Sequence, residues 1–216
     1  MEPEFWQEKW DAGQIGFHSD DVHTDLHDYV DAWLAGGPHQ ILVPLCGKSV
    51  DLAWLAAKGH EVIGIELAKK AVIALFNDAG LTPTWTDVPG AERAQAGNLT
   101  VYCGNLFDIS PATIGPITRV WDRAAFIALH PSQRASYVAR LRACLAPKGK
   151  LLMNVLNYDP AVMDGPPWAV DGSIVAQHYP EAIQLGTRDA LDDRWKSRGH
   201  ERVEAVTWQA DVKSDA

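Results

Sequence analysis

Three groups that suit recognition of a nucleoside each follow an apolar stretch of the chain. Gly47 lies in PLCGKSVD (44–51), where a glycine lets the backbone come close to a ligand. Glu66 ends the stretch HEVIGIE, 19 residues further on, and an acidic residue about 20 positions after a glycine turn is placed to accept both hydroxyls of an adenosyl ribose. CGNLFD (103–108) brings a side-chain amide and an aromatic ring that suit a purine. The alternative for Glu66 is that it caps a helix starting at Lys69.

The glycine turn does not fit the two common motifs that bind phosphate. GKS (47–49) ends like a phosphate-binding loop, but the pattern G-x-x-x-x-G-K-[ST] needs a glycine at position 42, where Leu42 lies inside the apolar run 41–45. The dinucleotide pattern G-x-G-x-x-G is also missing, because the positions from Lys48 to Asp51 hold no glycine. A ligand with adenosine but without pyrophosphate therefore fits better, and S-adenosylmethionine is such a ligand.

The elements that must position these groups alternate between strands and helices. Alternation of this kind implies parallel strands joined by right-handed crossovers, with ligands bound beyond the carboxyl ends of the strands. We therefore expect an α/β, doubly wound, mostly parallel seven-stranded sheet of Rossmann-like methyltransferase type with an antiparallel C-terminal hairpin. The predicted strands are 41–45, 61–66, 99–103, 118–122, 150–157, 182–188 and 202–210, and the predicted helices are 49–58, 69–79, 131–146 and 173–178.

Length and composition narrow the class of protein. The 216 residues suit a single domain, 1–216, with an N-terminal lid or helical segment at 1–35 and a catalytic α/β core at 39–216. The formal net charge of −9, without a Lys/Arg cluster, argues against nucleic acid or an anionic membrane surface as partner. No stretch approaches the roughly 18 apolar residues of a membrane span, and the N-terminus has no apolar run typical of a signal peptide. We expect a cytoplasmic monomer.

Two other segments hold residues that elsewhere do chemistry. HSDDVHTDLHD (18–28) places His23 and His27 one helical turn apart, as a metal site would need, but a capped, solvated helix start explains the same residues. Cys46 beside the glycine turn has no neighbouring histidine to activate it as a nucleophile. We expect no metal and a buried thiol.

The whole chain resembles the thiopurine S-methyltransferase family, the class I methyltransferases that methylate aromatic and heterocyclic thiols. The resemblance implies S-adenosylmethionine as cofactor, S-adenosylhomocysteine as product and a small-molecule thiol as acceptor. The motifs that carry it are FWQEKWDAGQIGFH (5–18), VPLCGKSVDLAWLAAKGHEVIGIEL (43–67), WDRAAFIALHP (121–131), YDPAVMDGPPWAV (158–170) and, more weakly, DRWKSRGHERVEAVTW (193–208).

The resemblance also implies the site residues. For the cofactor these are Trp6, Trp10, Leu45, Gly47, Glu66, Asn105, Leu106 and Arg123, and for the acceptor they are Phe17, Pro166, Pro167 and Trp168. Trp208 stands where a tyrosine is usual in the family, so the identity of the acceptor stays open.

The reaction that follows is direct attack of a sulfur nucleophile on the sulfonium methyl. Opposite charges on the two reactants vanish in the transition state, so the site gains from alignment and from stabilising the thiolate beforehand. Arg123 is the first candidate for the second role, because a permanent cation lowers the pKa of a nearby thiol, and Arg194 is a weaker candidate. An acidic aromatic thiol requires no dedicated general base.

Alternative activities share a soft acceptor. Selenium and tellurium compounds are further acceptors that the family implies. A methyltransferase for thiocyanate, sulfide or halide is the next alternative, and a non-catalytic S-adenosylmethionine-binding module is a third. Arg123 and the Pro-rich segment argue against the third, since a sensor needs no acceptor pocket.

Overall fold

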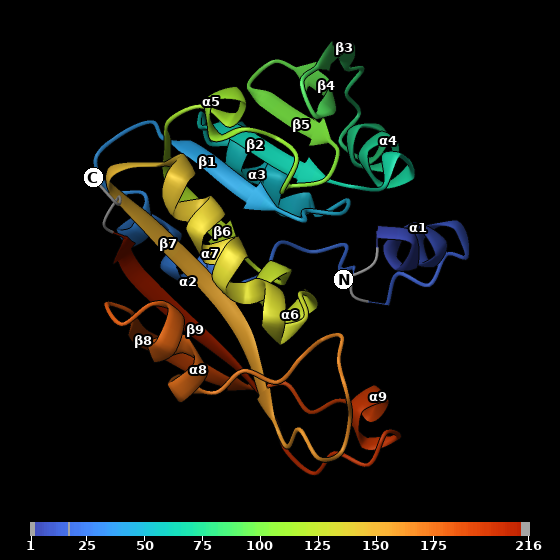
Figure 1. Cartoon of the computed structure of the whole chain (residues 1–216), viewed down its shortest axis with the longest axis vertical. Helices are drawn as coiled ribbons and strands as arrows, with labels where there is room; N and C mark the ends of the chain where they lie inside the picture. Colours follow the sequence, from blue (N-terminus) through green and yellow to red (C-terminus); the bar gives the residue numbers. More distant parts are fainter. Residues whose placement is uncertain (1–2, 17, 213–216) are drawn as a thin grey trace. The chain divides into compact units, whose positions relative to one another are not determined.

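The computed structural model describes residues 3–16 and 18–212, which fall into two compact units (Figure 1). The first unit is Met1–Val120 and the second is Trp121–Ala216, so strand β6 (Ile117–Asp122) crosses the boundary between them. The single domain expected from the length of the chain stays a prediction.

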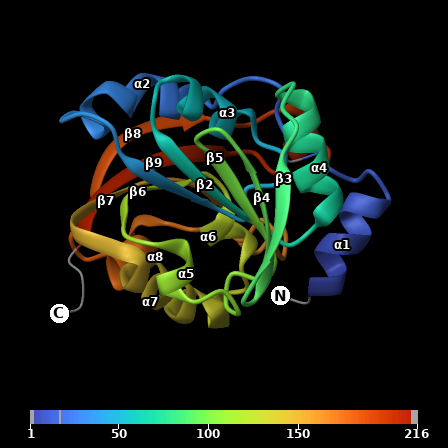
Figure 2. The same cartoon turned by 90° about the horizontal axis from the view of Figure 1, so that it is seen from above.

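The first unit is built on parallel strands with a hairpin at one edge, in the order β3-β4-β5-β2-β1-β6. Strand β2 pairs in parallel with β1 and β5, whereas β4 pairs antiparallel with β3 and β5. The strands are β1 (Gln40–Pro44), β2 (Glu61–Glu66), β3 (Thr84–Val88), β4 (Ala91–Ala96) and β5 (Leu99–Cys103). The helices are α1 (Pro3–Asp11), α2 (Thr24–Trp33), α3 (Val50–Ala57), α4 (Lys69–Asp78) and α5 (Pro111–Ile114), and Figure 2 shows α1 beside α4.

The register of the parallel strands brings their carboxyl ends to one edge. Pro44 at the end of β1 pairs with Ile65, and Glu66 at the end of β2 pairs with Cys103 at the end of β5. Buried apolar residues fill these strands, as expected where helices cover both faces of a parallel sheet. The glycine turn, Glu66 and the segment after β5 therefore meet at the same edge, as the sequence predicts.

The second unit is an antiparallel arrangement in the order β7-β9-β8, packed with helices. Strand β9 pairs with β7 over ten residues and with β8 through a register shift near Gly186. The predicted antiparallel C-terminal hairpin is thus confirmed. The elements are α6 (Ala125–Ala128), the 3-10 turn η1 (Pro131–Gln133), α7 (Arg134–Cys144), β7 (Leu145–Tyr158), α8 (Gly172–His178), β8 (Ile183–Asp189), α9 (Asp193–Lys196) and β9 (Val203–Val212).

The α/β methyltransferase fold class is confirmed, and the strand count is corrected. The part of the chain that the structure describes holds nine strands where the sequence predicts seven. The two missed strands are β3 and β4, whose sequences TWTDV and AERAQA are polar and largely exposed or half-buried. The helix expected at 131–146 divides into η1 and α7, because His130 caps the 3-10 turn before Arg134 starts the longer helix.

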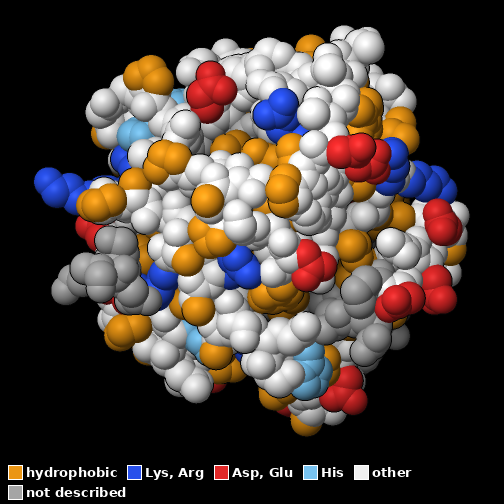
Figure 3. Space-filling view, turned by 45° about the horizontal axis from the view of Figure 1, so that its top comes forward, with side chains coloured by type: hydrophobic (Ala, Val, Ile, Leu, Met, Phe, Trp, Pro, Cys, Tyr) orange, Lys and Arg blue, Asp and Glu red, His pale blue; other side chains and the backbone are white. Residues whose placement is uncertain are grey.

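The described surface carries charges of both signs (Figure 3). On the face drawn in Figure 3, Lys and Arg side chains are scattered among Asp and Glu and do not gather into one broad patch. Within residues 3–16 and 18–212, no helix combines the length and the apolar character that crossing a membrane requires.

Candidate active site

The turn after β1 holds two residues in left-handed backbone conformations. Leu45 has φ 48° and Gly47 has φ 54°, and a left-handed leucine is strained in a way that recurs at ligand sites. A Cβ placed on Gly47 would lie 3.2 Å from Cζ2 of Trp10. The turn is therefore a narrow cradle that requires glycine at position 47.

Glu66 fastens this turn to the start of α4. Its Oε2 accepts the Gly47 N–H at 2.8 Å, and its Oε1 accepts the Ala68 N–H at 2.8 Å. The side chain is 7% exposed, and burial raises the pKa of the carboxyl while the backbone hydrogen bonds oppose that rise. The helix-capping alternative is thus part of the answer. The Leu67 N–H is a further backbone donor to this carboxylate, which has about four lone-pair sites in all, so room remains to accept a ligand hydroxyl.

Trp10 lies over the glycine turn as part of an apolar cluster. It is 5% exposed and packs with Ala68 and Ala71 of the α4 start, with Ile15 against them. Lys70 adds a hydrogen bond from Nζ to the Asp11 carbonyl at 3.2 Å.

Of the other two aromatic site residues predicted near the N-terminus, the structure describes Trp6 but not Phe17. Trp6 is half-buried on α1, with its ring 5.3 Å from that of Phe5 in an edge arrangement. Phe17, predicted to line the acceptor pocket, lies outside the described residues.

The segment after β5 packs against the turn between β3 and β4. The Gly104 N–H donates to the Glu66 carbonyl at 2.9 Å, and Leu106 is 3% exposed. Asn105 Oδ1 accepts the Phe107 N–H at 3.1 Å, so this amide shapes the loop. A Cβ on Gly104 would lie 2.6 Å from the Gly90 carbonyl oxygen. The hairpin therefore braces the loop predicted to frame the purine.

Sequence reasoning missed this brace. The signal available was Pro89-Gly90, a turn-forming dipeptide between two short runs.

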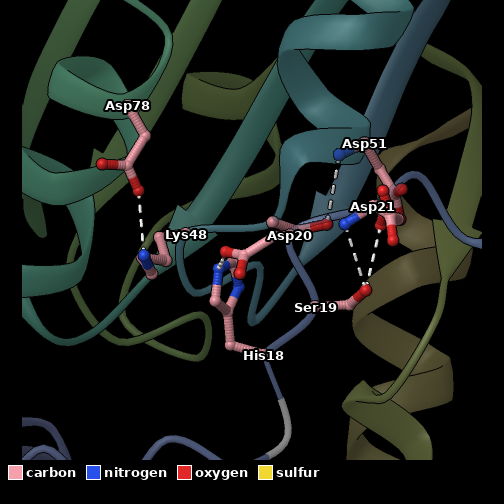
Figure 4. Close-up of polar contacts among 8 residues, drawn as sticks. His18, Ser19, Asp20, Asp21, Lys48, Asp51 and Asp78 are labelled. Carbon is pink, nitrogen blue, oxygen red and sulfur yellow. Dashed lines mark hydrogen bonds and ion pairs between the residues drawn. The ribbon is translucent and has the colours of Figure 1, made fainter.

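The segment after residue 17 has polar contacts within itself and one backbone contact with α3 (Figure 4). Asp51 of α3 accepts the His23 N–H at 2.9 Å. Lys48 of the GKS sequence pairs with Asp78 of α4 at 2.9 Å. Among the described residues, no group of three or more His, Cys, Asp or Glu is arranged to hold a metal ion.

In the second unit, Asp122 ends β6, and Arg123 follows it on the way into α6. Asp122 is fully buried, and its Oδ1 accepts the Phe126 N–H at 3.2 Å while its Oδ2 accepts the Tyr137 hydroxyl at 2.7 Å. Burial raises the pKa of Asp122 to about 6. Arg123, half-buried, is thus held between an anchored neighbour and a short helix.

The predicted acceptor segment is fastened at two points. The backbone N–H of Trp168 donates to the Ile127 carbonyl of α6 at 2.7 Å, and the Trp168 ring meets the His130 ring edge-on at 5.0 Å. The Tyr158 hydroxyl at the end of β7 donates to the Pro167 carbonyl. Pro166 and Pro167 follow cis peptide bonds and are half-buried.

Arg194 lies apart from these contacts on α9. Its side chain is exposed, 3.8 Å from Asp192 and 5.9 Å over the ring of Trp195. Trp195 packs in turn on Tyr158, which holds the acceptor segment. Arg194 remains a candidate by sequence, at the border of the same segment.

A cavity of about 280 Å³ in the second unit holds none of the predicted site residues. Asn157, Glu204 and Trp208 are among its lining, and Asn157 donates to Glu204 at 3.1 Å.

Within the first unit, the structure thus brings together Trp10, Leu45, Gly47, Glu66 and the loop holding Asn105 and Leu106. A glycine cradle beside a buried carboxylate with spare lone pairs, covered by an indole, fits an adenosine-bearing cofactor. Within the second unit, it links the Arg123 turn to Trp168 through α6.

The fold defines the class of protein. The chain is similar to a solved 1,6-didemethyltoxoflavin-N1-methyltransferase from Burkholderia thailandensis with bound S-adenosylhomocysteine, with a TM-score of 0.65, 16% identity and coverage of 97% of this chain and 87% of that chain. At this identity the likeness shows the fold alone, which is that of S-adenosylmethionine-dependent methyltransferases.

The sequence comparison then defines the family. Residues 1–212 match the family model described as thiopurine S-methyltransferase. The chain is 38% identical over 199 residues to a thiopurine S-methyltransferase from Pseudomonas fluorescens, covering 91% of both chains. It is 42% identical over 193 residues to one from Vibrio atlanticus, covering 88% of both. The chain belongs to the thiopurine S-methyltransferase family and is an S-adenosylmethionine-dependent methyltransferase, with S-adenosylhomocysteine as product.

Proposed function

We propose that this enzyme transfers the methyl group of S-adenosylmethionine to the sulfur of aromatic and heterocyclic thiols, thiopurines among them. The observation that carries the proposal is the Glu66-fastened cradle at Gly47 under Trp10, which suits the cofactor of the family. The acceptor class follows from relatives whose names are thiopurine S-methyltransferase.

The residues of the first unit would hold the cofactor. When bound, S-adenosylmethionine supplies an electrophilic methyl group on a sulfonium. The free lone pairs of Glu66 would accept ribose hydroxyls, and the left-handed turn at Leu45 and Gly47 would let the backbone approach. Trp10 and Trp6 would cover the site, with an indole face that favours a cation. Segment 1–35 would then act as the lid of a single methyltransferase domain.

The residues of the second unit would hold the acceptor. Arg123 would favour the thiolate over the thiol, because a permanent cation stabilises a nearby anion. Pro166, Pro167 and Trp168 would orient the acceptor ring, and alignment is the larger part of what this reaction needs. The family resemblance implies an acceptor role for Phe17 as well. Arg194 would add positive potential at the border of the acceptor segment.

Further features of the activity belong to the same proposal. Selenium and tellurium compounds are soft acceptors that the same thiolate-stabilising site would accommodate. The enzyme would act as a cytoplasmic monomer on small molecules. An acceptor class limited to thiocyanate, sulfide or halide is the competing activity on this fold, and a non-catalytic sensor of S-adenosylmethionine is the competing non-enzyme.

An acceptor panel tests the proposal. Labelled S-adenosylmethionine is incubated with thiopurines, thiophenols, selenite, tellurite and thiocyanate, and methylated products are quantified. Label in the thiopurine and thiophenol products supports the proposal. Label only in methyl thiocyanate would favour the competing enzyme, and cofactor binding without any methylated product would favour the sensor.

Arg123→Gln gives a sharper test of the catalytic assignment. Its loss in kcat/KM should be largest for acceptors of high thiol pKa, since each pKa unit is worth about 1.4 kcal/mol and an ionised thiol needs little help. Arg202→Gln is the matched control, because Arg202 is exposed and pairs with Glu204. A loss that is equal for every acceptor and tracks cofactor affinity would make Arg123 a binding residue only.

A further inference from the structure

The end of β6 holds a buried carboxylate, Asp122, whose hydrogen bonds among the described residues come from the second unit. Asp122 accepts the Phe126 N–H and the Tyr137 hydroxyl, with the Ala125 N–H as a further backbone donor. Asp122 and Tyr137 are both 0% exposed. Buried carboxylates are stable only when such donors satisfy them, so the pair is a fixed point of this unit.

A short chain of contacts leads from this fixed point to the acceptor segment. Phe126 belongs to α6, and the next residue, Ile127, offers its carbonyl to the Trp168 N–H at 2.7 Å. Arg123 lies between Asp122 and α6, so its backbone is bounded on both sides by the same anchor. Displacing α6 would move the Arg123 turn and Trp168 together.

The groups packed around the pair come from three helices. Tyr137 reaches Asp122 from α7, and Tyr179 at the end of α8 adds a second buried hydroxyl near it. The Arg134 guanidinium lies 5.0 Å from the centre of the Phe126 ring, and His178 meets that ring edge-on at 5.4 Å. The Tyr179 hydroxyl is buried and has no hydrogen-bond partner among the described residues.

We propose that Asp122 and Tyr137 form a positioning pair that sets α6, and through it Arg123 and Trp168, for binding and alignment of the acceptor. Neither side chain touches the acceptor, since both are fully buried. The inference rests on the proposed function and adds to it a residue that the reaction does not use directly.

The pair also makes acceptor use depend on pH. The ionised carboxylate accepts all of its donors, whereas a protonated one carries a hydrogen of its own that competes with the Tyr137 hydroxyl at Oδ2. The pKa of Asp122 is raised to about 6, so this change falls in the weakly acidic range. The Tyr137 hydrogen bond holds that pKa below where burial alone would place it, so its removal should shift the acid limb of activity to higher pH.

Tyr137→Phe tests the pair, with Tyr179→Phe as its matched control. Both changes remove one fully buried hydroxyl from the same cluster, but only that of Tyr137 donates to Asp122. The assay is kcat/KM against pH around 6 with an electron-poor thiophenol that stays ionised throughout, alongside calorimetry of S-adenosylhomocysteine.

We expect Tyr137→Phe to lose about tenfold in kcat/KM for the acceptor, to keep the cofactor affinity of the parent, and to show an acid limb at higher pH. Asp122→Asn should abolish the acid limb, and Tyr179→Phe should behave as the parent. Equal behaviour of the two phenylalanine variants, or an acid limb unmoved in Tyr137→Phe, would overturn the pair while leaving the proposed function intact. A parent enzyme that methylates no thiol would overturn both. If Tyr137→Phe fails to fold, the comparison of the parent with Asp122→Asn tests the pair. An acid limb of kcat/KM in the parent that is lost in Asp122→Asn supports the pair, and a limb that persists in Asp122→Asn overturns it.

Discussion

Replacing Glu66 separates the two tasks that its carboxylate performs. The side chain satisfies two buried N–H groups, of Gly47 and Ala68, each at 2.8 Å. Glu66→Ala leaves both without an acceptor, and one buried unsatisfied group costs about 1–3 kcal/mol. The upper estimate for Glu66→Ala is therefore about 2–6 kcal/mol of unfolding free energy. Glu66→Gln keeps one acceptor oxygen and should cost about half as much.

The raised pKa of Glu66 makes the stability cost of these substitutions depend on pH. The folded carboxyl has a pKa raised above its ordinary value of 4.5, chiefly by burial. The folded state therefore binds the proton more tightly, and the stability that this group contributes falls as pH rises from 4.5 through the folded pKa. Glu66→Gln removes that dependence. Its cost in stability should be larger at acidic pH and smaller at neutral pH.

Denaturant unfolding and calorimetry measure the two tasks on the same proteins. For folded Glu66→Gln and Glu66→Ala, binding of S-adenosylhomocysteine should weaken by about 1–3 kcal/mol, or roughly 5- to 150-fold. Glu92→Gln is the control, because Glu92 is a half-exposed carboxylate that pairs with Lys69 at 2.7 Å and should lose little. Unchanged cofactor affinity in folded Glu66 variants would refute the ribose role and leave Glu66 a structural fastening only.

Three further predictions concern the rest of the first unit. Gly104→Ala should destabilise by about 1–3 kcal/mol in denaturant unfolding, because its Cβ meets the hairpin backbone, whereas Gly172→Ala makes only ordinary contacts; equal effects would remove the brace. Burial lowers the pKa values of His39 and His60, so stability should fall as pH drops below 6.5; a urea midpoint as acid-sensitive in His60→Asn as in the parent would contradict this. Amide exchange around Trp10 should slow when S-adenosylhomocysteine binds; equal rates in both states would refute a lid.

The buried strands could be predicted because their signal is local. Apolar residues concentrated in short segments after Gly59 and Gly97 mark β2 and β5, whose observed bounds match the predicted 61–66 and 99–103. Their ends then follow from parallel pairing alone. The positions of Gly47 and Glu66 at one edge needed no knowledge of side-chain contacts.

The β3–β4 hairpin could not be predicted in the same way. Its residues are polar and largely exposed or half-buried, so the apolar pattern that marks a strand is missing. What holds it is pairing of β4 with β5 and the close contact of Gly90 with Gly104. Such stabilisation comes from distant parts of the chain, and only turn chemistry at Pro89-Gly90 hinted at it.

For Glu66 the sequence indicated the residue but not all of its contacts. The sequence offered ribose binding and helix capping as alternatives for Glu66, whereas the folded carboxylate caps α4 and also fastens the glycine turn. The Tyr137 hydroxyl satisfies Asp122, and no sequence spacing signals this contact because the two residues lie 15 positions apart on different elements.

Glu66 and Asp122 are buried carboxylates that anchor the backbone at the ends of β2 and β6 in the same way. Each is a buried carboxylate at the last residue of a strand, each accepts an N–H at the start of the following helix, and burial raises the pKa of each. They differ in the second oxygen, which binds the glycine turn in one and Tyr137 in the other. Since both anchors act on the backbone, the cofactor cradle and the acceptor turn are set before any ligand arrives. Acid should therefore weaken acceptor use through Asp122 near pH 6, whereas Glu66 changes the stability of the cradle from pH 4.5 upward.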